Sequence, residues 1–160
     1  MKSVFRASAP SQNFVKWFLI VVAVAGVCIF VWGHLYSSVV VLLGGENFTA
    51  RVADTPTKRM KGLGGTAPLG KNDAMLFIFP DKGIQTFWMK DLSYPIDIIW
   101  FADGEIVDIA PRVAPPQSSD EKVLRLYKPR LPVDRVLEVP AGTADRLGLK
   151  IGDKIMVTEN

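Results

Sequence analysis

The chain has 160 residues, of which 49% are hydrophobic and 22% charged, and this ordinary globular composition excludes a largely disordered protein. It contains one histidine, His34, and one cysteine, Cys28, so we expect no histidine-based triad, no metal site, no cofactor and no internal disulfide. The formal charge is +3, but residues 48–160 hold 16 basic and 15 acidic residues. The excess lies near the N-terminus, and this distribution predicts no nucleic-acid partner.

An apolar segment covers residues 18–36, and within it only His34 is ionisable. As a helix, it would be roughly 28 Å long, close to the roughly 30 Å hydrocarbon core of a bilayer. The basic residues nearest to it all precede it: Lys2, Arg6 and Lys16. By the positive-inside rule, this pattern predicts a cytoplasmic tail at residues 1–17, a transmembrane signal-anchor helix at 18–36 and a linker at 37–46. It places the protein in the inner membrane, with residues 47–160 outside the cytoplasm.

Two other interpretations of this segment stay open. A signal peptide would be cleaved after a small-x-small motif, and the residues after Trp32 offer no clean site of this kind. A lipoprotein would be modified at Cys28, but the preceding residue, Val27, is larger than the small residue normally found there. We assign no functional role to Cys28 or His34.

From residue 47 onward, short apolar runs alternate with turn signals. They predict strands at residues 47–53, 74–79, 84–89, 96–101, 105–110, 134–139 and 154–158, with a further candidate at 123–127. Two short helices are predicted, one starting at the Thr55-Pro56 pair and one at residues 141–147 with Thr143 as its cap. Residues 37–46 either extend the anchor helix or form a first strand. The fold class is mainly β: a compact β-barrel or sandwich-like domain with two short helices, preceded by one transmembrane helix.

Three blocks of sequence resemble the signature of a known family: MLFIF (Met75–Phe79), FWMKDLSYPIDIIWF (Phe87–Phe101) and VLEVPAGTADRLGLKIGD (Val136–Asp153). They are similar to the blocks of the domain-of-unknown-function 192 family (DUF192), small and often exported bacterial and archaeal proteins. The resemblance implies a predominantly β fold and no particular activity. The chain departs from the family pattern at Gly64-Gly65, where a methionine and a basic residue are common, and at Asp91-Leu92, where Asn-Thr is common.

The residues around the FWMK block have the most unusual local chemistry. Trp88 could supply a flat wall and Lys90 a cation for a ligand, although packing is an equally ordinary role for large aromatic residues. Asp97 and Glu138 each interrupt an apolar strand, so burial of either would require a partner or a raised pKa, whereas simple alternation would place both on outer faces. The candidate ligand-binding residues are Trp88, Lys90, Asp91, Tyr94, Asp97 and Glu138.

These observations favour a binding or accessory module for an envelope partner or a small ligand. One alternative is a carboxylate-based, hydrolase-like enzyme that uses Asp97 and Glu138 as acid and base. Another is an accessory subunit whose anchor helix packs in a larger membrane complex. No catalytic residue is assigned by the favoured hypothesis.

Overall fold

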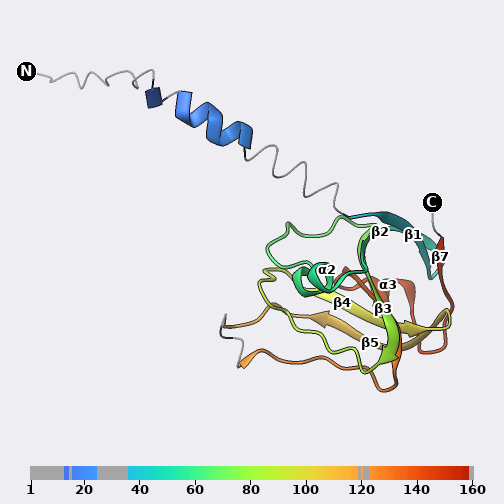
Figure 1. Ribbon diagram of the computed structural model, residues 1–160. Coiled ribbons are helices and arrows are strands. Elements are labelled where there is room, and N and C mark those ends of the chain that lie inside the picture. The colour runs from blue at the N-terminus through green and yellow to red at the C-terminus, as the bar shows by residue number, and fades with distance from the viewer. Residues whose placement is uncertain (1–12, 15, 25–35, 119, 121–122, 159–160) are drawn as a thin grey trace, which may run out of the picture. The chain divides into compact units, whose positions relative to one another are not determined.

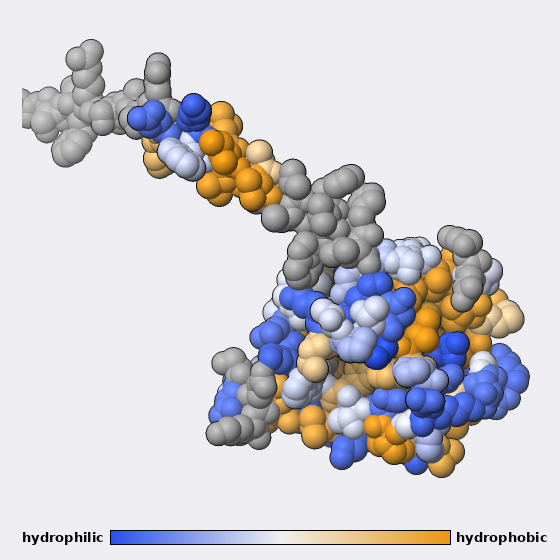
Figure 2. Space-filling model, viewed as in Figure 1, coloured by the Kyte–Doolittle hydropathy of each residue, from blue (hydrophilic) through white to orange (hydrophobic). Residues whose placement is uncertain are grey.

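The computed structural model describes residues 13–14, 16–24, 36–118, 120 and 123–158 (Figure 1). The chain divides into two compact units, Met1–Tyr36 and Ser37–Asn160. In the first unit, residues 16–24 are helical, and their surface is largely hydrophobic (Figure 2). The visible face of the second unit instead mixes hydrophilic and hydrophobic residues (Figure 2).

The predicted membrane anchor at residues 18–36 requires a correction. Among the described residues, no helix is long and apolar enough to cross a membrane. The helical residues 16–24 extend over roughly 14 Å, about half of a hydrocarbon core. Residues 25–35 of the predicted span, with Cys28 and His34, lie outside the described residues. The finding overturns the predicted single-pass location in the inner membrane.

A single curled sheet, a half-barrel of seven strands, forms the second unit over its described residues. The strand order is β5-β4-β6-β3-β2-β1-β7, and all neighbours are antiparallel except β2 and β3, which the short helix α2 connects. The strands are β1 (Ser38–Leu43), β2 (Glu46–Ala53), β3 (Asp73–Gly83), β4 (Ile96–Ala102), β5 (Glu105–Val113), β6 (Val133–Pro140) and β7 (Ile155–Thr158). The helices of this unit are α2 (Pro56–Lys61) and α3 (Thr143–Leu147).

The curl brings the two edge strands together at one end of the sheet. The Ile106 amide donates to the Asp153 carbonyl over 2.9 Å, and the Ile155 amide donates to the Gly104 carbonyl over 3.0 Å. These bonds join the β4–β5 turn to the start of β7. The mainly β, barrel-like prediction is therefore confirmed in its coarser form, as a half-barrel.

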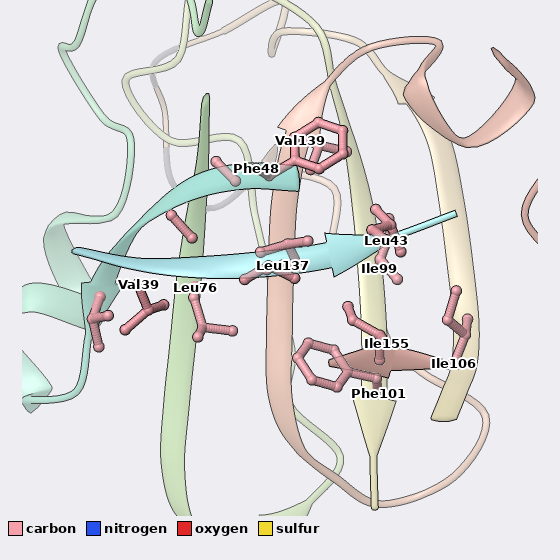
Figure 3. Packing of buried hydrophobic residues seen from close by; sticks show 14 residues of the cluster. Val39, Leu43, Phe48, Leu76, Ile99, Phe101, Ile106, Leu137, Val139 and Ile155 are labelled. Carbon is pink, nitrogen blue, oxygen red and sulfur yellow. The ribbon is translucent and has the colours of Figure 1, made fainter. Parts of the chain in front are cut away.

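The main hydrophobic core fills the inside of the curl. Figure 3 shows its side chains between β1 and β2 on one side and the central strands on the other. The strands β1, β2, β3, β4 and β6 contribute alternate residues to it, as the pleat requires, and β5 and β7 contribute one buried residue each. The labelled members are Val39, Leu43, Phe48, Leu76, Ile99, Phe101, Ile106, Leu137, Val139 and Ile155.

The opposite face of the central strands is also buried. Phe87 makes edge-to-face contacts with Phe77 and Trp100, at centroid distances of 4.8 and 6.3 Å. The Trp100 Nε1–H donates to the Gln85 carbonyl over 2.9 Å. The segment 84–92 thus covers this outer face, and all seven residues of β4 are buried as a result.

Most predicted elements are confirmed, and the departures are confined to residues 81–89, residues 123–127 and the cap of α3. Residues 37–46 form β1 and its turn, so the strand alternative for this segment is correct. The predicted strand at 84–89 is wrong: this run buries Phe87 and Met89, and within the described residues it forms one isolated bridge, between Phe87 and Tyr127. The candidate strand at 123–127 is likewise limited to that bridge. Residues 81–83, which lie between the strands predicted at 74–79 and 84–89, belong to the end of β3. Gly142, rather than Thr143, is the N-cap of α3.

Candidate functional site

Helix α2 places the cationic side chains of Arg59 and Lys61 beside the outer face of the sheet. Thr55 caps the helix by accepting a hydrogen bond from the Lys58 amide over 3.3 Å, Pro56 begins the first turn, and Gly62 ends the helix. Arg59 is held firmly, since its Nη1 donates to the carbonyls of Asp54 and Ile78 over 2.7 and 2.8 Å. Its guanidinium also lies 5.0 Å from the centre of the Phe79 ring.

The chain after α2 approaches the segment 84–92 closely. The Gly65 amide donates to the Asp91 carbonyl over 2.8 Å. A Cβ at Gly64 would lie only 3.2 Å from the Lys61 carbonyl oxygen and 3.3 Å from that of Lys90. The backbone can pass between these groups because position 64 has no side chain.

A pocket of about 340 Å³ lies between α2 and the segment 84–92, with the outer face of β3 and β6 as its floor. This volume falls at the lower end of the range for small-molecule sites. Aromatic rings and three cationic side chains dominate its lining. The lining residues are Pro56, Arg59, Met60, Lys61, Gly62, Leu63, Gly64, Phe77, Phe79, Thr86, Phe87, Trp88, Lys90, Leu92 and Glu138.

Glu138 is the only acidic residue among those lining the pocket, and it is 5% exposed. Its partners across the sheet are Met75 on β3 and Ile98 on β4, both apolar and buried. No group of the described residues hydrogen-bonds its Oε2 atom. Burial raises the pKa of this carboxyl group to about 8, so the group is mostly protonated at neutral pH and can donate a hydrogen bond.

Two residues of the predicted site, Trp88 and Lys90, also line this pocket. Trp88 is 36% exposed, and the Lys90 Nζ lies 5.9 Å from the centre of its ring. The structure therefore brings Trp88, Lys90 and Glu138 together, as three of the six predicted binding residues.

The other three predicted residues do not line the pocket. Asp91 is exposed and occupies a left-handed turn with φ of 56°. Tyr94 is buried, and its hydroxyl shares a 2.7 Å hydrogen bond with the Thr66 hydroxyl. These contacts give Asp91 and Tyr94 roles in the turn and its packing.

Asp97, the last of the six, is fully buried and has ample partners. Its Oδ1 accepts from the amides of Arg112 and Gly142 over 2.7 and 3.0 Å, and its Oδ2 accepts from the Ala144 amide over 2.7 Å. One carboxylate thus joins β4, the end of β5 and the first turn of α3. The alternative that simple alternation places both carboxyl groups on outer faces is wrong for Asp97, whereas Glu138 does lie on the outer face of the sheet but is buried there.

The register places the two carboxyl groups on opposite faces of the sheet. Asp97 pairs with Val139, a member of the main core, whereas Glu138 pairs with Ile98 on the outer face. Because directly paired residues share a face, the side chains of Asp97 and Glu138 point apart. The acid–base pair that the hydrolase-like alternative requires is not assembled.

Several residues of the pocket were not predicted from the sequence, above all Arg59, Lys61 and Phe79. Their proximity to Trp88 depends on the β2-α2-β3 crossover, for which the sequence gives no local signal. No group of three or more potential metal ligands occurs among the described residues.

Comparisons with known proteins agree with the resemblance in the sequence. The DUF192 family profile, described as "Uncharacterized ACR", matches residues 39–157. A search of the curated proteins gives no match. The chain is similar to a crystal structure of a Novosphingobium aromaticivorans DSM 12444 protein of unknown function, at 31% identity and a TM-score of 0.66, over 76% of this chain and 84% of that one. It is also similar to a Sinorhizobium meliloti 1021 protein described as a candidate transcription regulator, at 30% identity and a TM-score of 0.67, over 76% and 95%.

Replacing Asp97 with Asn tests whether this residue is architectural. The amide has one acceptor oxygen for three backbone donors, so we expect Asp97→Asn to lower the free energy of unfolding by about 2–3 kcal/mol in urea denaturation. Asp91→Asn is the matched control, because Asp91 is exposed and Asn tolerates its backbone conformation, and it should stay within about 0.5 kcal/mol of the wild type. If Asp97→Asn unfolds at the same urea concentration as the wild type, Asp97 is not architectural and is again a candidate for ligand binding.

The raised pKa of Glu138 makes the stability depend on pH. The pKa of the Glu138 carboxyl group is near 4.5 in the unfolded chain and near 8 in the folded chain. The folded state therefore gains stability from holding this proton, and that gain is fully present below pH 4.5 and is lost as the pH rises through 8. Glu138→Gln removes the titration. We expect the free energy of unfolding of the variant, relative to that of the wild type, to rise by about 4 kcal/mol between pH 4.5 and pH 8 in urea denaturation. A difference between the two proteins that stays the same at both pH values would contradict this burial.

Proposed function

The chain belongs to the DUF192 family, and we propose that it is a binding module that takes a small ligand in the pocket between α2 and the segment 84–92. The observation that carries this proposal is Glu138, a buried carboxyl group that lines the pocket and whose Oε2 atom has no hydrogen-bond partner among the described residues. Leaving such a group unpaired costs about 1–3 kcal/mol. A ligand in the pocket would supply the missing partner.

The surroundings of Glu138 support the proposal. The Arg59 side chain is already fixed without a ligand, by its hydrogen bond to the Ile78 carbonyl and its cation–π contact with Phe79. Phe87 is fixed by its edge-to-face contact with Phe77. A pocket whose walls are already ordered loses less entropy on binding. Trp88, the most exposed of the aromatic side chains named here, would close over an apolar ligand from the solvent side.

The alternative functions receive less support. An enzyme that uses Asp97 and Glu138 together conflicts with their positions on opposite faces. The accessory-subunit hypothesis depended on the predicted anchor helix, and no helix of the described residues is long and apolar enough to cross a membrane. The description of the Sinorhizobium protein as a transcription regulator gives little support to a nucleic-acid-binding role for this chain, because residues 48–160 hold nearly equal numbers of basic and acidic residues, 16 and 15.

Titration of the full chain with three aromatic probes of similar size tests the proposal: phenylacetate, phenylacetamide and phenethylamine. We expect at least one of them to cause saturable amide shifts in NMR spectra, concentrated at residues 62–64 and 86–92. Thr86→Trp should abolish these shifts, because Thr86 is exposed and lines the pocket, so that the larger side chain fills it.

Ile151→Ala is the control for this experiment. Ile151 is exposed and apolar but lies outside the pocket lining, so the variant should bind as the wild type does. The proposal would be wrong if none of the three probes saturates. It would also be wrong if the shifts survive in Thr86→Trp.

A further inference from the structure

The charges around the pocket indicate which chemical class of ligand it takes. Arg59 and Lys61 reach the pocket from α2, and Lys90 reaches it from the covering segment. β3 contributes only apolar groups, Phe77 and Phe79, and β6 contributes Glu138 as the single acidic group of the lining. A ligand in this pocket therefore meets three cations, and a cationic ligand would be repelled.

Arg59 is the best-positioned of these cations. Its Nη1 is already engaged by two backbone carbonyls, and the guanidinium rests on the Phe79 ring. The remaining N–H groups of a guanidinium lie in a fixed plane that suits the two oxygens of a carboxylate. The fixed orientation means that little side-chain entropy is lost when an anion binds.

The aromatic residues define the rest of the ligand. Phe87 is buried against the sheet, and Trp88 lies at the surface of the same segment. Flat apolar surfaces of this kind favour a planar or aliphatic body over a strongly hydrated one. A small inorganic anion would leave these rings uncovered.

Resting on the proposed function, we infer that the pocket is a site for a small organic monoanion: a carboxylate on an apolar body, with the carboxylate held by the cations and by a hydrogen bond donated from Glu138. Its neutral carboxyl group, flanked by Met75 and Ile98, supplies that donor. The raised pKa of Glu138, about 8, is consistent with this role at neutral pH. Above pH 8 the group loses the donor proton and repels the ligand.

The effect of ligand charge on affinity can be measured with two probes of nearly equal shape, phenylacetate and its neutral amide, phenylacetamide. We expect the full chain to bind phenylacetate at least tenfold more tightly in calorimetric or NMR titrations at pH 6.5. Lys61→Gln should weaken phenylacetate binding about 3–10-fold and leave phenylacetamide unchanged. Lys150→Gln, which removes an exposed cation outside the pocket, should alter neither.

The dependence on pH tests the role of Glu138 itself. For the wild type, phenylacetate affinity should fall about tenfold or more between pH 6.5 and pH 9, following the loss of the neutral form. Glu138→Gln keeps a donor that does not titrate, so its affinity should stay nearly constant over this range. Glu138→Ala should bind weakly at every pH.

The outcomes distinguish this inference from the proposed function. If phenylacetamide binds as tightly as phenylacetate and Thr86→Trp abolishes both, the pocket is a ligand site and the anion inference is wrong. If the wild type and Glu138→Gln have the same pH profile, Glu138 is not the donor. If no probe binds, the proposed function itself fails.

Discussion

The central strands β3, β6 and β4 are buried on both faces over their middle residues, and the environments of the two acidic candidates on them, Asp97 and Glu138, follow from this constraint. The main core fills the inside of the curled sheet, and the segment 84–92 with α2 covers the outside. A polar side chain in the middle of these strands is covered whichever face it points to. It must find protein partners, remain neutral, or face a cavity.

Asp97 and Glu138 show two different solutions to this constraint. Asp97 points toward the main core and accepts three backbone N–H groups at the junction of β5 and α3, so its burial is compensated within the protein. Glu138 points to the outer face, where its cross-strand neighbours are apolar and no group in the described part of the chain hydrogen-bonds its Oε2 atom. The same sequence signal, an acidic residue within an apolar run, therefore marks an architectural residue in one strand and a candidate binding residue in another.

The sequence predicted most strands and α2 because their signals are local: the alternation at 47–53, the Asp103-Gly104 hairpin turn and the Thr55 cap. It failed at 84–89, because an apolar run that packs across a sheet resembles one that pairs within it. Of the site, it identified Trp88, Lys90 and Glu138 from unusual local chemistry. Arg59 and Lys61 were missed since only the crossover from β2 to β3 places them there. The three amides that bind Asp97 come from 15 to 47 residues away in sequence, beyond any local pattern.

The account depends most on one physical claim, that Glu138 is a buried, neutral hydrogen-bond donor at the floor of the pocket. The direct measurement is a ¹³C NMR titration of the glutamate side-chain carboxyl carbons in the full chain, with the Glu138 signal assigned by its loss in Glu138→Gln. The account predicts a titration midpoint near pH 8. A midpoint near the ordinary glutamate value of 4.5 would show that the carboxyl group is solvated or paired, and would contradict it.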